Sequence, residues 1–154
     1  MFVIVGKARP NDQTGDVELY LGQFRQMYRT QGQFVYAWSF NPDERAIDMI
    51  QQHIDNKDDV FLYLPVDGRR SNLRMHIISF CHNRNGIGTC PAVWRPYCIN
   101  ELQGHQNWGV HLWFLIDAID DLPQHVDLLN TFAPALTDKY QNWGQSYFAF
   151  LREV

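Results

Sequence analysis

The side chains best suited to metal or thiol chemistry gather in one short stretch of the chain. Cys81, Cys90 and Cys98 follow one another closely, and His82 is adjacent to the first of them. Four such groups could ligate zinc, but zinc sites pair their ligands two to four residues apart, and only the adjacent Cys81 and His82 are close here. Zinc is therefore disfavoured. Because three cysteines fit no complete disulfide framework, we expect buried or free thiols in a reducing compartment.

Catalytic signatures are absent from the sequence. It holds no G-x-S-x-G, P-loop, dinucleotide fingerprint or H-E-x-x-H. A nucleophilic Cys81 or Cys98 with His105 as its base lacks a third group to orient the histidine. His76 and His111 are expected to be ordinary, half-exposed strand residues. The sequence thus predicts a protein that is not itself an enzyme and that uses no metal or cofactor, with a catalytic partner left open.

Aromatic residues are the most prominent chemical feature that remains. The chain contains five tryptophans. Trp113 and Trp143 are expected in the core, whereas Trp94 and Trp108 fall in or beside a long polar loop. There they either fix the loop to the body or offer a stacking surface. A base stacked on such a ring contributes about 1–3 kcal/mol, and a buried methyl group adds about 0.8 kcal/mol.

Charge is distributed unevenly along the chain, although the net charge is only −4. No acid occurs between Asp67 and Glu101, a span that carries five arginines. A weaker basic zone lies near the N-terminus, with Lys7, Arg9, Arg25 and Arg29. Such asymmetry is compatible with one positive face that holds phosphates, or simply with solvated loop arginines.

Hydrophobic periodicity predicts a single α+β domain over residues 1–154. The sheet would be a twisted mixed sheet or a small open barrel, flanked by helices. A long loop at 82–107 suggests function. The expected strands are 2–6, 34–38, 59–65, 74–81, 108–120 and 144–154; the expected helices are 17–28, 44–54 and a proline-led helix at 121–136.

Two helix starts are expected from local signals. Asn41 would cap the helix at 44–54, with Pro42 at its first helical position. Asp120 and Asp121 would serve as caps at a strand-to-helix turn. No apolar run approaches the roughly 20 residues of a membrane span, and no signal peptide is recognisable. We therefore expect a soluble, cytoplasmic protein without membrane contact.

The junction at 33–47, "QFVYAWSFNPDERAI", places Trp38 at the end of a strand, followed by Ser39 and Asn41. A tryptophan at this point either fills a corner of the core or lines a binding site. Together with "FVIVGKARPND" (2–12), "TCPAVWRPYC" (89–98) and "GVHLWFLIDAIDDLP" (109–123), the junction resembles the PUA-like superfamily, nearest its YTH and EVE branches. The resemblance covers about residues 1–133.

This resemblance implies an aromatic cage for a modified base. Trp38 and Trp94 would form facing walls, and Ser39 and Asn41 would hydrogen-bond the base edge. Ile99 stands where a third cage aromatic is expected, so Tyr97 or Trp108 would have to replace it. The residues that would hold the phosphates are Lys7, Arg9, Arg69, Arg70, Arg74, Arg84 and Arg95.

The function implied is a reader that flips a methylated base, N6-methyladenine or a modified cytosine, out of methylated DNA. Such a domain resembles the recognition part of McrB-like, methylation-dependent restriction systems, with a nuclease or NTPase subunit or fused domain as partner. Three alternatives stay open. The chain could read N6-methyladenosine in RNA, it could be a PUA- or ASCH-like RNA-processing enzyme that uses Lys7, or it could bind a protein through exposed tryptophans.

Overall fold

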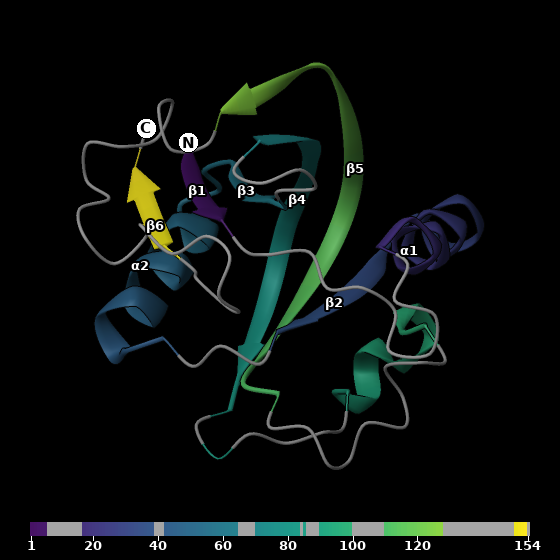
Figure 1. Cartoon of the computed structure of the whole chain (residues 1–154). Helices are drawn as coiled ribbons and strands as arrows, with labels where there is room; N and C mark the ends of the chain where they lie inside the picture. The colour runs from purple at the N-terminus through teal and green to yellow at the C-terminus, as the bar shows by residue number, and fades with distance from the viewer. Residues whose placement is uncertain are drawn as a thin grey trace.

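The computed structural model describes residues 1–5, 17–38, 42–64, 70–83, 85, 90–99, 110–127 and 150–153. Figure 1 shows the arrangement of the elements. In chain order they are β1 (Phe2–Val5), α1 (Val17–Gln31), β2 (Phe34–Trp38), α2 (Glu44–Asp55), β3 (Val60–Tyr63), β4 (Arg70–His82), the 3-10 helix η1 (Ala92–Tyr97), β5 (Leu112–Asp127) and β6 (Phe150–Glu153).

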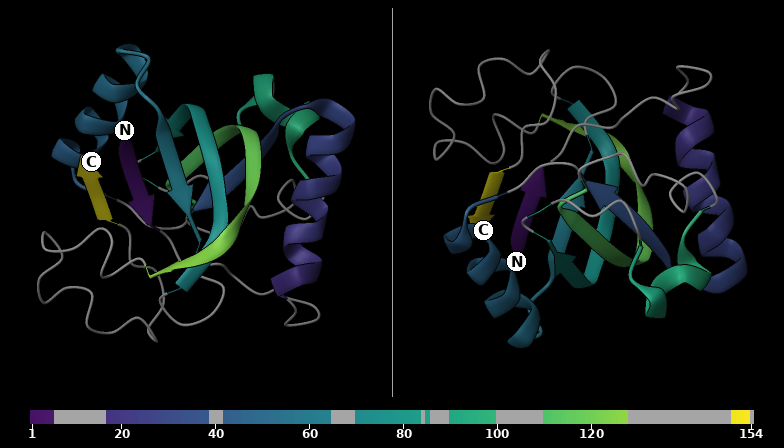
Figure 2. Two further views of the ribbon diagram at one scale, coloured as in Figure 1. Left: turned by 90° about the horizontal axis from the view of Figure 1, so that it is seen from above. Right: turned by 90° about the horizontal axis from the view of Figure 1, so that it is seen from below.

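The strands form one six-stranded mixed sheet in the order β2-β5-β4-β3-β1-β6. Among the strands that the structure describes, only β1 and β3 pair in parallel; the other neighbours are antiparallel. β4 and β5 are long and curved, and the two α-helices flank opposite ends of the sheet (Figure 2). The expected α+β class, with a mixed sheet and flanking helices, is therefore confirmed.

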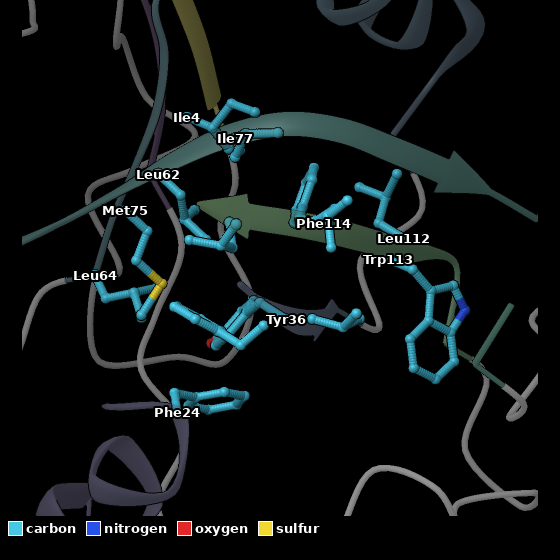
Figure 3. Close-up of a cluster of buried hydrophobic side chains, with 14 of the residues drawn as sticks. Ile4, Phe24, Tyr36, Leu62, Leu64, Met75, Ile77, Leu112, Trp113 and Phe114 are labelled. Atoms are coloured by element: carbon cyan, nitrogen blue, oxygen red, sulfur yellow. The ribbon is translucent and has the colours of Figure 1, made fainter. Parts of the chain in front are cut away.

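An apolar core covers the curved sheet and includes residues of α1, of α2 and of the segment around η1. Every residue of β1 is buried, as its β-branched and aromatic sequence predicts. Phe24 of α1 packs against Phe34 and Tyr36 of β2, with ring centroids 5.3 Å and 5.4 Å away. Figure 3 shows Phe24 and Tyr36 beside side chains from the central strands, among them Leu62, Met75 and Phe114. The helical spacing of the α1 sequence thus correctly identified the face that packs on the sheet.

Helix α2 begins at Glu44, as the expected range 44–54 has it, but its N-cap lies two residues later than the sequence suggests. Asp43 is the N-cap residue, and its Oδ1 accepts a hydrogen bond of 2.9 Å from the backbone N–H of Ala46. The prediction that Asn41 caps the helix is wrong, because an Asp43 carboxylate already lies opposite the free N–H groups of the first turn. Pro42 accordingly precedes the cap and is not the first helical residue.

The prediction of a proline-led helix at 121–136 is wrong for its first seven residues, 121–127, because they belong to β5. Pro123 is tolerated there because the ladder with β4 is interrupted between the pairs Leu73–Asp121 and Ser71–Val126. Such a bulge needs no backbone N–H from the proline, so its usual penalty in a strand does not arise. Residues 128–136 lie outside the described part of the chain, as does Trp143.

The loop at 82–107 contains an element that hydrophobic periodicity missed, the 3-10 helix η1. At the chain's end, β6 confirms the last residues of the expected strand at 144–154 and pairs antiparallel with β1. None of the helices in the described ranges is long and apolar enough to cross a bilayer.

Ser71 offers a sharp test of the sheet. Its hydroxyl is fully buried beside β3 and β4, lies 2.6 Å from the Leu64 carbonyl oxygen, and accepts a 3.0 Å hydrogen bond from the Leu73 N–H. Ser71→Ala leaves these buried backbone groups without their hydrogen-bond partner, so we expect a loss of about 1–3 kcal/mol in the free energy of unfolding. Urea denaturation measures the loss. The half-buried Ser79, on the same strand, is the control: if Ser79→Ala costs as much, the buried hydrogen bonds are not the cause.

Candidate nucleic-acid interface

Three strand ends meet at one end of the sheet. Trp38, the last residue of β2, pairs with Leu112, the first residue of β5. Leu112 pairs on its other side with His82, the last residue of β4, and the Asn83 N–H donates a 2.8 Å hydrogen bond to the His111 carbonyl. The backbone of Trp38 is therefore fixed by the ladder. Its side chain lies outside the described part of the structure.

Helix η1 carries Trp94 and packs against β2. A backbone hydrogen bond closes each end of η1: the Trp94 N–H donates to the Pro91 carbonyl (2.9 Å), and the Cys98 N–H donates to the Arg95 carbonyl (3.1 Å). Trp94 is half-buried and rests on the core, whereas Arg95 is exposed. Trp94 is thus anchored on the core and still partly exposed.

A disulfide joins Cys90 to Cys98 across the two ends of η1. The expectation of free or merely buried thiols is wrong for this pair, and a Cys98 nucleophile with His105 is wrong for the same reason. The odd count misled because the third cysteine, Cys81, stays unpaired on β4. No group of histidine, cysteine or acidic side chains within the described residues could hold a metal ion.

The position where a third cage aromatic was expected belongs to the core. Ile99 follows the disulfide and is only 4 % exposed. Tyr97, one of its two proposed replacements, lies on η1 beside Trp94 and is half-buried against the same core. Trp108, the other replacement, lies outside the described residues, as do Ser39 and Asn41.

Arg74, one of the arginines expected to hold phosphate, is already paired. Its guanidinium lies 3.1 Å from Asp120 Oδ2 and 4.3 Å from the centroid of the Phe61 ring. Burial alone would lower the pKa of Arg74, but interactions with Tyr63 and Asp120 outweigh it and raise the pKa above its ordinary value. Its guanidinium therefore already has a carboxylate partner within the protein.

Arg95 is in a different situation. It is exposed on η1, beside Trp94 in the sequence, and no acidic partner is found for it among the residues that the structure describes. Arg70 starts β4, and only its backbone is described. The remaining candidate phosphate ligands, Lys7, Arg9, Arg69 and Arg84, lie outside the described ranges.

A polar cluster that was not expected from the sequence links β4 and β5 to Asp59, the residue that precedes β3. His76 Nδ1 lies 2.6 Å from Asp117 Oδ1, and its Nε2 lies 3.4 Å from Asp59 Oδ1. Asp121 receives two hydrogen bonds, 2.7 Å and 2.8 Å long, from the guanidinium of Arg25 on α1. Asp120 and Asp121 are thus strand residues in ion pairs, and the prediction that they cap a helix is wrong.

This polar cluster joins neighbouring elements of the fold through side-chain ion pairs. The half-buried position of His76 and His111 was foreseen, but the carboxylates around His76 were not. Their approach depends on the β4–β5 register, which shifts between His76 and Ile77 and brings Asp117 beside the imidazole. Only the paired strands reveal this juxtaposition.

An open hollow lies along the exposed face of α2, and its charge is wrong for a polyanion. Its lining carries three acids and one arginine: Asp43, Glu44, Arg45, Asp48, Met49 and Gln52. This hollow is therefore not a candidate for holding phosphates.

The chain matches no protein-family model, no curated protein and no solved structure.

Proposed function

We propose that this protein is a PUA-like reader, of the YTH/EVE type, that binds a methylated base in nucleic acid. The observation that carries the proposal is that η1, with the half-buried Trp94, packs against β2, the strand that ends at Trp38. Two tryptophans far apart in the sequence are thus carried by neighbouring elements. In the proposed complex their rings stack on the two faces of one flipped base.

The surroundings of Trp94 favour a polyanionic ligand. The neighbouring Arg95 is exposed and can contact a phosphate next to the flipped base, whereas Arg74 is compensated by Asp120. Methylated DNA, with N6-methyladenine or a modified cytosine, is the preferred ligand, and a nuclease or NTPase subunit would supply catalysis. A methyl contact by itself discriminates about 10–200-fold, so we expect selectivity within that range.

Binding of matched oligonucleotides tests the proposal. Tryptophan fluorescence is titrated with DNA and RNA strands that are identical except for one N6-methyladenine, one 5-methylcytosine or no modification. We expect salt-dependent quenching and a preference for one modified strand. Equal affinity for modified and plain strands would contradict the proposal that the protein reads a modification. The absence of binding to any strand would contradict the proposal that it binds nucleic acid.

Arg95 and Arg74 form a matched pair for testing the phosphate contact. If Arg95 holds one phosphate, Arg95→Gln should weaken binding of modified and plain strands alike and reduce the slope of log K against log salt by about 0.7–0.9. Arg74→Gln should leave that slope unchanged because its charge is already compensated. The affinities are measured at four salt concentrations. A reduced slope for Arg74→Gln but not for Arg95→Gln would place the phosphate contact elsewhere.

A further inference from the structure

The Cys90–Cys98 disulfide lies where it can control the proposed base-binding site. Its two cysteines are eight residues apart and enclose the whole of η1. Cys98 is also the C-cap residue of η1, and Cys90 directly precedes the N-cap residue Pro91. Both cysteines are almost fully buried, with 3 % and 1 % exposure, in the same core on which Trp94 rests.

Helix η1 depends on restraints from outside the helix. A 3-10 helix rarely runs beyond three or four residues, because its hydrogen bonds are poorly aligned, yet η1 extends over six and contains Pro96. None of its residues is fully buried, and Val93 is 76 % exposed. The disulfide closes this segment covalently, so the position of Trp94 is tied to the state of the two sulfurs.

We propose that Cys90–Cys98 is a redox-controlled latch that holds Trp94 in the position for base binding. The ligand in this inference rests on the proposed function, whereas the effect of the disulfide on η1 is independent of it. In the oxidised form the latch keeps η1 closed against β2. In the reduced form η1 opens more often, and the wall formed by Trp94 is no longer held in place.

The chemistry is thiol–disulfide exchange with a low-molecular-weight disulfide such as glutathione disulfide. One cysteine thiolate attacks this oxidant, forms a mixed disulfide and releases one glutathione thiolate. The second cysteine thiolate then attacks the protein sulfur of the mixed disulfide, which forms the Cys90–Cys98 bond and releases the second glutathione. Two electrons pass from the protein to the oxidant, and the two thiol protons end on the released glutathiones.

Linkage gives the inference a quantitative form. If the disulfide strengthens binding of the modified strand by some factor, the bound strand must favour the disulfide over the dithiol by the same factor. We expect that factor to be about tenfold or more, because reduction returns conformational freedom to the closed segment.

Hydrogen exchange without ligand tests the mechanical half of the latch. Dithiothreitol should accelerate exchange at the amides of Trp94 and Cys98, which close η1, by about tenfold or more, while the β5 amides of Leu112–Ile116 stay unchanged. Cys81→Ser should respond as the unchanged protein does, and the double variant Cys90→Ser, Cys98→Ser should exchange fast with or without dithiothreitol. Equal exchange in the oxidised and reduced wild-type protein would overturn the latch.

Equilibration in glutathione redox buffers tests the regulatory half. The fraction of Cys90–Cys98 disulfide, read by alkylation and mass spectrometry, should rise when the preferred methylated strand is added and rise clearly less with the same concentration of the plain strand. Binding that is equal in both redox states would overturn the regulation and leave the reader function intact. If no strand binds, while dithiothreitol still accelerates exchange in η1, the reader function and its regulation both fail and only the mechanical coupling stands.

Discussion

Trp113→Ala is expected to lower the free energy of unfolding by about 3–5 kcal/mol. Trp113 is 2 % exposed and is the second residue of β5, where it pairs with Ala37 of β2 and Cys81 of β4. Truncation removes one of the largest fully buried side chains among the described residues and leaves a cavity beside the three paired strands. Native domains are stable by only about 5–15 kcal/mol, so this change consumes a large part of the total. Urea denaturation followed by circular dichroism measures it.

Two further variants make this test specific. Trp113→Phe keeps an aromatic ring in the cavity and should cost clearly less than Trp113→Ala. Val93→Ala, at a side chain that is 76 % exposed, should change stability by less than about 0.5 kcal/mol. A loss below about 1 kcal/mol for Trp113→Ala would mean that this side chain is not packed in the core against the sheet.

Trp94→Ala is expected to weaken binding of the preferred methylated strand by about 1–3 kcal/mol, or roughly 5–150-fold. The indole would contribute one stacking face and, through the methyl contact, part of the selectivity. The preference for the modified strand over the plain strand should therefore fall together with the affinity. Tryptophan fluorescence titration, with a labelled strand as a second readout, measures both quantities.

The controls for Trp94→Ala separate stacking from damage to the fold. Trp94→Phe keeps an aromatic face and should retain part of the preference. Val93→Ala changes an exposed neighbour on the same helix and should leave affinity and preference unaltered. Equal affinities for Trp94→Ala and the unchanged protein, with both folded by circular dichroism, would exclude Trp94 from the site.

Local patterns predicted most of the elements correctly. β1, α1 and β2 follow from the apolar run at 2–6, the helical spacing of Leu21 and Phe24, and the alternation at 34–38. Such elements are set by residues close in sequence, so periodicity is sufficient to identify them. The burial of Trp113 was foreseen for the same reason, because it lies inside an apolar strand.

Features that depend on distant residues were missed. The sequence around Pro123 predicted the start of a helix. The bulge that accommodates this proline in a strand exists only once β5 pairs with β4. The Cys90–Cys98 bond was overlooked because an odd cysteine count says nothing about which thiols approach each other. The ion pairs of Arg74 and His76 likewise depend on the register between strands. Of the candidate cage, the sequence supplied the tryptophans, and the structure supplied the contact between η1 and β2.

A double-mutant cycle on Trp38 and Trp94 tests the central claim most directly. Affinity for the preferred methylated strand is measured for the unchanged protein, for Trp38→Ala, for Trp94→Ala and for the double variant. If both rings stack on the same base, the two losses should be non-additive, with a coupling energy of about 0.5–3 kcal/mol. Losses that add within about 0.3–0.5 kcal/mol, or no loss in either single variant, would contradict a shared base between the two rings.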